Sequence, residues 1–310
     1  MNQLVTLVDG SAPLCVREAQ MTEQEQGFAG RPAGNYDQRY FQVADPARGI
    51  SVTNDSARAI GDTFNVRHRH VFSQVRYFLA GSQTFGRETL SRGDVQFVGD
   101  SVYYGPIRSK FVPGAENLHF VQTQFAGPTG TPWADKTMVT VVRRELAQHG
   151  EFKGGIYHPE GGKPLDGLEA ILIAMASGVY RLTGDEVLEY PPQRLASPLH
   201  VHASLMPWLP FAPGIEIKHV MSMFETGPNV KIVRLRKGTV LPAGQADFQQ
   251  TRWLVEGAVA WGGEHYTALS CMFYPPGVPY PETVSAADDT VLVIVQWTNA
   301  AQPALPFTQL

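Results

Sequence analysis

The sequence HRHVFSQVRYFLAG, residues 68–81, combines two histidines two positions apart with a β-prone segment that ends at a glycine. In a β-strand alternate side chains lie on the same face, so His68 and His70 are expected to point the same way. On the segment that follows, Gln74 and Arg76 are expected to share one face. This pattern predicts one wall of a β-barrel on which several polar groups meet, as they do in a metal pocket.

Part of this stretch is repeated later in the chain. QVRYFLAG at residues 74–81 matches QTRWLVEG at residues 250–257, with a displacement of 176 residues. The Gln, Arg and Gly positions coincide, and an aromatic residue matches an aromatic residue. The same displacement places residues 99–104 on residues 275–280, where both blocks end in tyrosine with valine two positions before it. Because two separate blocks share one displacement, the chain is predicted to be a tandem duplication of a β-rich domain.

The segments around these blocks are typical of an all-β fold. Short β-prone runs separated by turn residues favour a sandwich or a barrel in each copy. Between the copies, residues 136–149 and 166–177 are predicted to be helices, each followed by glycine. We therefore expect an N-terminal barrel with N-terminal strands over residues 1–130, a connector with one or two helices over 131–210, and a degenerate barrel over 211–310.

The motifs resemble those of the cupin superfamily. The first cupin motif is His-x-His, a glutamate and a glycine, and the chain has His68, His70 and Gly81 at the right spacing, with Gln74 in place of the glutamate. Where the second motif ends in histidine, this chain has Tyr104. The resemblance covers roughly residues 50–125 and 215–297. It implies two tandem double-stranded β-helix (jelly-roll) barrels, a bicupin.

The resemblance also implies a mononuclear metal site in the first barrel. His68 and His70, together with Gln74 or His119, would hold one divalent ion. Iron is the first choice for this ion, and zinc, manganese and nickel are alternatives. The other interpretation is a barrel that binds no metal. His119 would take part only if it faces inward. Tyr104 would act as hydrogen-bond donor or as general acid and base beside His68 and His70.

Three residues on the inward face are predicted to contact a substrate, namely Gln74, Arg76 and Phe78. A buried guanidinium needs an acceptor, which is either an internal partner or the carboxylate of a ligand. Arg252 repeats the position of Arg76, and Glu256 follows it as an expected local partner. An internal partner is expected for Arg76, and the absence of such a carboxylate in the first copy is the best hint in the sequence of an anionic substrate.

The second copy lacks the histidines of the first, because the displacement brings Gly244 and Ala246 to their positions. It is therefore expected to be structural or to support a dimer contact. A further His-x-His, His200 and His202, has no strand glycine at the family spacing, and these histidines are expected to be solvated or to pack in the connector.

Composition limits the remaining possibilities. The chain has 310 residues, 43% hydrophobic and 17% charged, which predicts a folded core. Its net charge of −4 argues against nucleic-acid binding. Cys15 and Cys271 are the only cysteines in the sequence, and no leader or membrane span is recognised in it. A cytoplasmic protein is therefore expected. A homodimer is the assembly considered for it.

Three functions are compatible with these features. The first is a metal-dependent oxygenase, most simply a dioxygenase, acting on a small carboxylated or oxygenated molecule. The second is a metal-free isomerase or cyclase that uses histidine and tyrosine for proton transfer. The third is a bicupin that binds a small molecule without catalysis.

Overall fold

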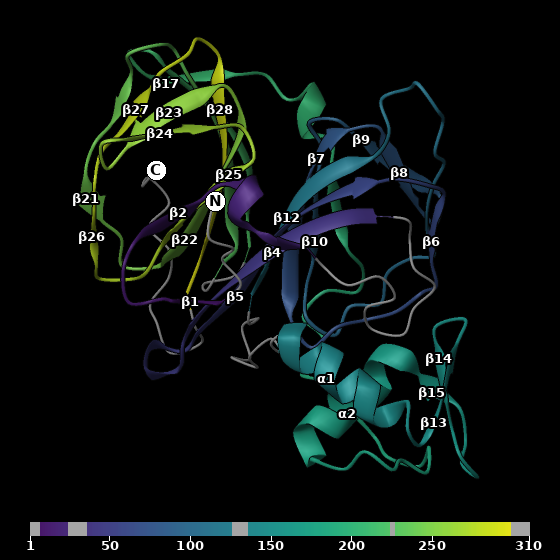
Figure 1. The fold of residues 1–310 in the computed structure, drawn as a ribbon. Coiled ribbons are helices and arrows are strands. Elements are labelled where there is room, and N and C mark those ends of the chain that lie inside the picture. The colour runs from purple at the N-terminus through teal and green to yellow at the C-terminus, as the bar shows by residue number, and fades with distance from the viewer. Residues whose placement is uncertain (1–6, 24–35, 126–135, 224–226, 299–310) are drawn as a thin grey trace.

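The computed structural model describes residues 7–23, 36–125, 136–223 and 227–298. Within these ranges the chain forms two β-barrels, one drawn in purple and blue and the other in green and yellow, with a small helical unit below the first (Figure 1). This confirms the predicted all-β fold of two tandem jelly-roll barrels with a partly helical connector.

The first barrel is built from two facing sheets. In spatial order the larger sheet contains β1 (Leu7–Asp9), β4 (Tyr36–Asp45), β5 (Ile50–Ala59), β12 (His119–Phe125), β7 (Ser73–Ala80), β10 (Val95–Val98) and β16 (Leu199–Val201), with β3 (Thr22–Glu23) paired to β4. The smaller sheet contains β6 (Thr63–Asn65), β11 (Ile107–Ser109), β8 (Ser82–Phe85) and β9 (Glu88–Ser91).

The second barrel has the same plan. Its larger sheet contains β17 (Leu209–Ala212), β18 (Ile215–Ser222), β19 (Asn229–Leu235), β28 (Thr290–Trp297), β22 (Gln249–Glu256), β25 (Ser270–Tyr274) and β2 (Leu14–Val16). Facing it are β20 (Val240–Leu241), β27 (Thr283–Ser285), β23 (Ala258–Trp261) and β24 (Glu264–Thr267). A separate pair is formed by β21 (Gly244–Gln245) and β26 (Pro279–Tyr280).

Strand register follows the repeat that the sequence predicts. The isolated bridge between His68 and Tyr104 corresponds to the pairing of Gly244 with Tyr280, and both partners are displaced by 176 residues. The pairing of β7 with β10 and that of β22 with β25 are displaced by the same number. The two barrels can therefore be compared position by position.

Each barrel receives one strand from outside its own copy. Strand β2, near the N-terminus, pairs with β25 of the second barrel and places Val16 opposite Cys271. Strand β16, from the connector, pairs with β10 of the first barrel and places His200 opposite Gln96. The sequence carried no sign of this exchange, because three-residue strands have too little pattern to identify a partner.

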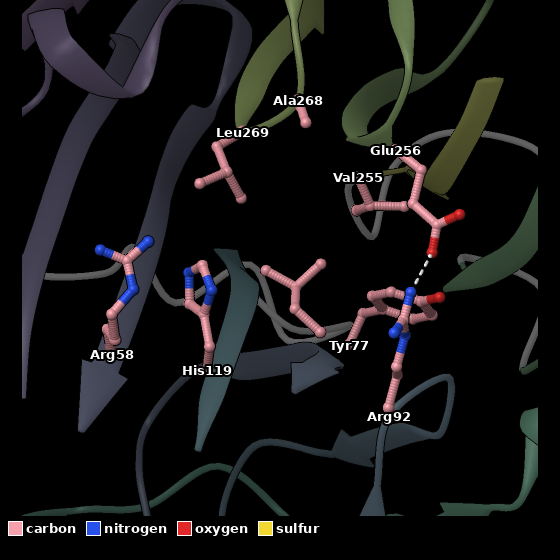
Figure 2. Close-up of a pocket in the computed structure, with 9 residues that line it drawn as sticks. Arg58, Tyr77, Arg92, His119, Val255, Glu256, Ala268 and Leu269 are labelled. Carbon is pink, nitrogen blue, oxygen red and sulfur yellow. Dashed lines mark hydrogen bonds and ion pairs between the residues drawn. The ribbon is translucent and has the colours of Figure 1, made fainter. Parts of the chain in front are cut away.

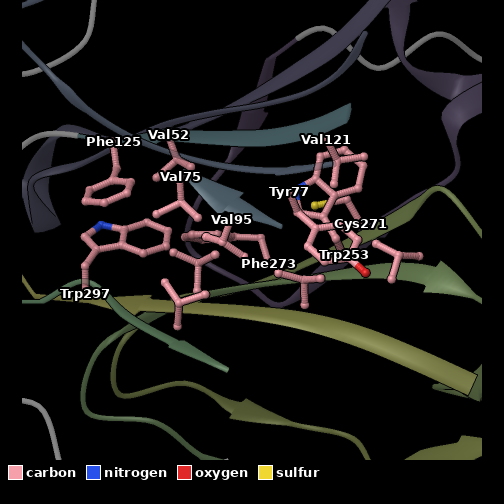
Figure 3. Close-up of a cluster of buried hydrophobic side chains, with 14 of the residues drawn as sticks. Val52, Val75, Tyr77, Val95, Val121, Phe125, Trp253, Cys271, Phe273 and Trp297 are labelled. Carbon is pink, nitrogen blue, oxygen red and sulfur yellow. The ribbon is translucent and has the colours of Figure 1, made fainter. Parts of the chain in front are cut away.

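The outer faces of the two larger sheets pack against each other and form the central hydrophobic core (Figure 3). Phe125 of the first barrel stacks on Trp297 of the second, with 4.6 Å between ring centroids. Trp253 donates its indole N–H to the hydroxyl of Thr123 at 3.2 Å. Because both barrels contribute to one core, burial of apolar surface holds them together.

The connector between the barrels contains α1 (Lys136–Leu146), α2 (Gly167–Ser177) and a small sheet of β13 (Gly150–Lys153), β14 (Ile156–Pro159) and β15 (Leu165–Asp166). Helix α2 lies where predicted, whereas α1 ends at Leu146, earlier than expected. The carboxylate of Asp166 caps α2, and Gly178 ends it with φ +70°. No described helix is long and apolar enough to cross a membrane.

The connector has its own core, which reaches the first barrel. Buried side chains of α1 and α2 pack with Val71 and Phe72, the two residues that follow the His-x-His. The loop that carries the histidines is therefore held between the barrel and the connector.

Candidate functional site

Four polar side chains meet in the first barrel, and the sequence predicted all four. His68, His70, Gln74 and Tyr104 are each less than 8% exposed. The ring centroids of His68 and Tyr104 lie 4.3 Å apart, and those of His68 and His70 lie 5.0 Å apart. The amide of Gln74 donates to the phenol oxygen of Tyr104 at 3.1 Å. We call these four residues the His-Tyr cluster.

Backbone hydrogen bonds fix the two loops that carry the cluster. The N–H groups of His68 and Tyr104 donate to each other's carbonyl oxygens at 3.0 and 2.9 Å. The N–H of Ser101 donates to the carbonyl of His70 at 2.7 Å, and Ser101 itself has φ +66°, which is unusual for a residue with a side chain. The His-x-His loop is thus bound to the loop before Tyr104 at two points.

The tautomer of His68 follows from its neighbour. Its Nδ1 lies 2.6 Å from the carbonyl oxygen of Val66. A carbonyl oxygen can only accept, so Nδ1 carries the proton and Nε2 keeps its lone pair. This arrangement is the one that orients metal-binding histidines.

The connector covers the cluster on one side. The His70 ring stacks on Phe72 with a centroid distance of 4.3 Å and an interplanar angle of 10°, and Phe72 belongs to the connector core. Between the histidines, the guanidinium of Arg69 lies 3.5 Å from the ring centroid of Tyr190. Aromatic contacts of this kind exclude water and fix the loop.

Arg76 lies deeper in the same barrel and is 6% exposed. Its Nε and Nη2 donate to the amide oxygen of Gln122 at 3.3 and 3.2 Å, and its Nη1 donates to that of Gln83 at 2.8 Å. Gln122 in turn donates to the carboxylate of Asp55 at 3.0 Å. Arg76 is therefore engaged inside the protein, and Asp55 balances its charge through one amide.

Phe78 lies deeper still, with no exposed surface. Its ring centroid is 6.2 Å from those of Phe85 and Phe120, in the hydrophobic floor of the barrel. It was predicted to contact a substrate, whereas in the structure it supports the polar residues from below.

The sequence missed four members of the polar layer at the level of Arg76, which are Asp55, Gln83, Gln96 and Gln122. Register shows why they belong together, because Asp55, Gln122, Arg76 and Gln96 lie side by side on β5, β12, β7 and β10. A polar residue at an inward position of each strand was the available signal. It could be read only once the strand order was known.

His119 does not join the cluster, so the prediction that it supplies a third imidazole is wrong. His119 shares the outer face of β12 with Val121 and Thr123, whereas the inward positions are occupied by Phe120, Gln122 and Gln124. His119 faces the second barrel, and its Nε2 lies 3.0 Å from the hydroxyl of Ser56 on the neighbouring strand β5.

A cavity of about 250 Å³ lies beside His119 at the junction of the barrels. Arg58, Tyr77 and Leu269 are among the residues that line it (Figure 2). Burial, assisted by the charge of Arg58, lowers the pKa of His119 to about 4. The imidazole is therefore neutral at physiological pH.

The expected pairing of Arg252 with Glu256 is also wrong. A bulge between Leu254 and Glu256 turns the carboxylate away from the barrel interior. Glu256 pairs instead with Arg92 of the first barrel at 3.0 Å, as Figure 2 shows. Arg252 donates to the amide oxygen of Gln250, a neighbour on its own strand.

The second His-x-His lies on β16, at the edge of the first barrel. His200 contacts the amide of Gln96 at 3.0 Å and the carboxylate of Glu88. His202 lies 3.2 Å from the carboxylate of Asp94. Both histidines contact side chains of the first barrel, and His202 is also half exposed, as the prediction of solvated or packed histidines allows.

The His-Tyr cluster has donors suited to a divalent ion. Two imidazoles, an amide oxygen and a phenol oxygen form a mixed nitrogen and oxygen set, which suits iron, zinc, nickel or manganese. Within the described ranges, no group of three or more His, Cys, Asp and Glu side chains is placed to bind a metal ion. A set of more than two metal ligands in the cluster therefore needs Gln74 and Tyr104. These ligands carry no formal negative charge unless Tyr104 ionises.

Comparison with known proteins identifies the fold. A sequence profile of the ChrR cupin-like domain family matches residues 196–300, which span most of the second barrel. A provisionally named dioxygenase from Nostoc punctiforme PCC 73102 is similar in structure, with a TM-score of 0.59 and 12% identity over 95% of this chain and 85% of that chain.

Oxalate decarboxylase from Bacillus subtilis is similar with a TM-score of 0.54 and 10% identity, over 93% of this chain and 77% of that chain. No curated protein sequence matches this chain. Together these likenesses show a cupin fold. The family profile matches the second barrel, which lacks counterparts of His68 and His70.

Proposed function

We propose that the chain is a small-molecule enzyme with one active pocket, built around the His-Tyr cluster of the first barrel. In this proposal His68 and His70 bind one divalent metal ion, and Gln74 and Tyr104 complete the set. The observation that carries it is the bond from His68 Nδ1 to the carbonyl of Val66, which directs the lone pair of Nε2 away from the backbone.

The reaction class that this site suits best is an oxygenase-type reaction on a small carboxylated or oxygenated molecule. A bound divalent ion would supply Lewis acidity and, if it is iron, a site for dioxygen. The chain's own residues have other tasks. Tyr104 holds or moves a proton at its phenol oxygen, Gln74 orients that oxygen, and the connector excludes water from the histidines.

The structural neighbours are compatible with this proposal, although they share only the fold. One is named as a dioxygenase, and the Bacillus oxalate decarboxylase is described with Mn(II) centres. Metal chemistry on small oxygenated molecules therefore occurs on barrels of this shape. For this chain the residues of the His-Tyr cluster carry the proposal.

Metal analysis of the purified protein tests the proposal. We expect about one ion of iron, manganese, zinc or nickel per chain, retained through dialysis and lost when His68 and His70 are both replaced by alanine. The His200→Ala/His202→Ala variant is a matched control, because it removes a second His-x-His from the same barrel. Equal metal content in the two double variants would contradict the assignment.

A metal-free isomerase or cyclase is the second candidate, and one contact favours it. The glutamate expected from the family is replaced by Gln74, which donates to the phenol oxygen of Tyr104. The phenol is thereby left to donate its proton elsewhere, and the His68 ring lies beside it as a base.

Replacing Tyr104 by phenylalanine tests this candidate. Loss of turnover with unchanged substrate affinity, in protein stripped of metal by chelation, supports acid–base catalysis by the phenol. Turnover that requires added metal excludes it.

A further inference from the structure

The cavity beside His119 lies at one end of the contact between the barrels, on the opposite face of the larger sheet from the His-Tyr cluster. We call it the junction cavity. Its volume is about 250 Å³. An apolar cavity of about 150 Å³ is large enough for benzene. The junction cavity therefore has room for one ring with polar substituents, and the proposed function makes no use of it.

Both barrels contribute apolar side chains to the wall of the junction cavity. Leu79 and Tyr77 come from the first barrel, and Val255 and Leu269 come from the second. All four belong to the central hydrophobic core or pack against it. Leu269 has φ +70°, which is rare for a large side chain, and Figure 2 shows this side chain projecting toward His119. Such a wall favours a ligand with a hydrocarbon body.

One cation of the junction cavity has no partner. Arg58 lies on β5 and is exposed, and no residue that the structure describes forms a hydrogen bond or ion pair with its guanidinium. The carboxylate of Asp37, which lies opposite on β4, is 3.7 Å from Arg39 instead. The other arginine of the cavity, Arg92, is paired with Glu256 at 3.0 Å. The guanidinium of Arg58 is therefore open to a ligand carboxylate, which it can bind with two parallel hydrogen bonds.

Hydrogen bonds fix the tautomer of His119. The hydroxyl of Ser56 donates to the carboxylate of Glu18 at 2.8 Å, so toward Nε2 of His119 it can only accept. The pKa of about 4 keeps the ring neutral, and its one proton is therefore on Nε2. Nδ1 keeps its lone pair, and within the described ranges no residue donates to it. An unused acceptor at this place suits a ligand hydroxyl.

The cation and the acceptor are neighbours. Arg58 and His119 are paired across β5 and β12, so their Cα atoms lie about 5 Å apart. Figure 2 shows the two side chains on one side of the cavity with Leu269 opposite them. One small molecule can therefore reach the guanidinium and the imidazole together while its apolar part contacts the second barrel.

We propose that the junction cavity binds a small hydroxy acid with an apolar body. The carboxylate pairs with Arg58, and the hydroxyl donates to Nδ1 of His119. The hydrocarbon part lies against Leu79, Val255 and Leu269. Because both barrels contact this ligand, binding also holds them together at the end of their shared core. The proposal is independent of any metal or reaction in the His-Tyr cluster.

Titration calorimetry of the full-length protein with mandelate tests the site, with two matched probes. Mandelamide keeps the ring and the hydroxyl but has no charge, and phenylacetate keeps the ring and the charge but has no hydroxyl. We expect mandelate to bind at one site with a Kd of about 0.1–1 mM. Mandelamide should bind about tenfold to a hundredfold more weakly and phenylacetate about three- to tenfold more weakly, because a charge-assisted bond contributes more than a neutral one. Equal binding of mandelate and mandelamide, or a Kd for mandelate above roughly 10 mM, overturns the proposal.

Substitutions place the ligand in the junction cavity. Arg58 is exposed, so Arg58→Met leaves the core intact; it should weaken mandelate binding by about tenfold to a hundredfold and leave mandelamide binding unchanged. His119→Leu should abolish the preference for mandelate over phenylacetate, and a retained preference contradicts the hydroxyl contact.

Two control variants should leave mandelate binding unchanged. Arg108→Met removes an exposed cation on β11, in the smaller sheet of the first barrel. His68→Ala/His70→Ala alters the His-Tyr cluster on the other face of the larger sheet. Mandelate binding that is as strong in Arg58→Met as in Arg108→Met overturns the proposal. So does loss of binding in His68→Ala/His70→Ala, which would place the ligand in the first barrel.

Discussion

Replacing Asp55 by asparagine tests the charge balance inside the first barrel. Asp55 has no exposed surface and accepts a hydrogen bond from Gln122, whose oxygen accepts two from Arg76. Asparagine keeps the shape and the possibility of a hydrogen bond but removes the negative charge. Arg76 then remains buried without that charge nearby.

The size of the effect follows from the spacing of the strands. With one amide between them, the charges of Asp55 and Arg76 lie about 8 Å apart, and at an effective dielectric constant of about 20 their attraction is about 2 kcal/mol. Exchanging a charge-assisted hydrogen bond for a neutral one adds about 1 kcal/mol. We therefore expect Asp55→Asn to lower the free energy of unfolding by about 3 kcal/mol, below the cost of breaking a direct buried pair.

Urea unfolding followed by tryptophan fluorescence measures this difference. Asp62→Asn is the matched control, because Asp62 pairs with Lys110 at 2.7 Å on the surface, where water screens the charges, and its loss should change the stability little. In the double variant Asp55→Asn/Arg76→Met the loss of stability should be smaller than the sum of the losses in the two single variants. Without the cation of Arg76, the negative charge of Asp55 no longer contributes to stability. A loss for Asp55→Asn no larger than for Asp62→Asn would refute the reasoning.

Three further predictions concern the contact between the barrels. Trp297→Ala should destabilise the protein by about 3–5 kcal/mol in urea unfolding, because the Phe125 ring that stacks on it then faces a cavity. Thr123→Val should cost about 1–3 kcal/mol by the same measurement, because the indole N–H of Trp253 is left without its acceptor, and a loss below roughly 0.5 kcal/mol would contradict this. The pKa of His119 is about 4 in the folded chain and 6.5 in the unfolded chain, so the unfolded chain binds a proton first as the pH falls. Stability should therefore fall between pH 6.5 and 4 by about 2–3 kcal/mol, and His119→Gln should flatten that part of the profile.

The repeat was the strongest information in the sequence. Matching Gln74 with Gln250 and Tyr104 with Tyr280 predicted two barrels and fixed the register within each, and the strand pairing agrees with it. The comparison of the two copies succeeded because two copies of one fold keep the same strand register even where their side chains differ. It also placed His68, His70, Gln74 and Tyr104 in one cluster.

The two wrong predictions have different physical causes. Strict alternation along β22 would place Glu256 beside Arg252, but the strand contains a bulge between Leu254 and Glu256. A bulge adds one residue and moves every side chain beyond it to the other face. For His119 the alternation holds, because it shares the face of Val121 and Thr123, and this face turned out to be the outer one. Which face of a strand points into a barrel depends on tertiary packing and leaves little trace in a short sequence.

The replacement of Asp55 by Lys231 at the equivalent position of the second barrel could have been found by sequence alone, since the two residues are 176 positions apart. What the sequence lacked was the burial of Asp55. Without it a lysine in a strand is most simply interpreted as a surface residue. Strand order and burial together show that both positions face a barrel interior.

Calorimetric titration of metal-stripped protein with Mn(II) tests most directly whether the His-Tyr cluster is the metal site. We predict one binding site per chain, abolished by His68→Ala and retained in His200→Ala. Binding that survives His68→Ala, or that is lost equally in both variants, would contradict the assignment of the cluster as the metal site.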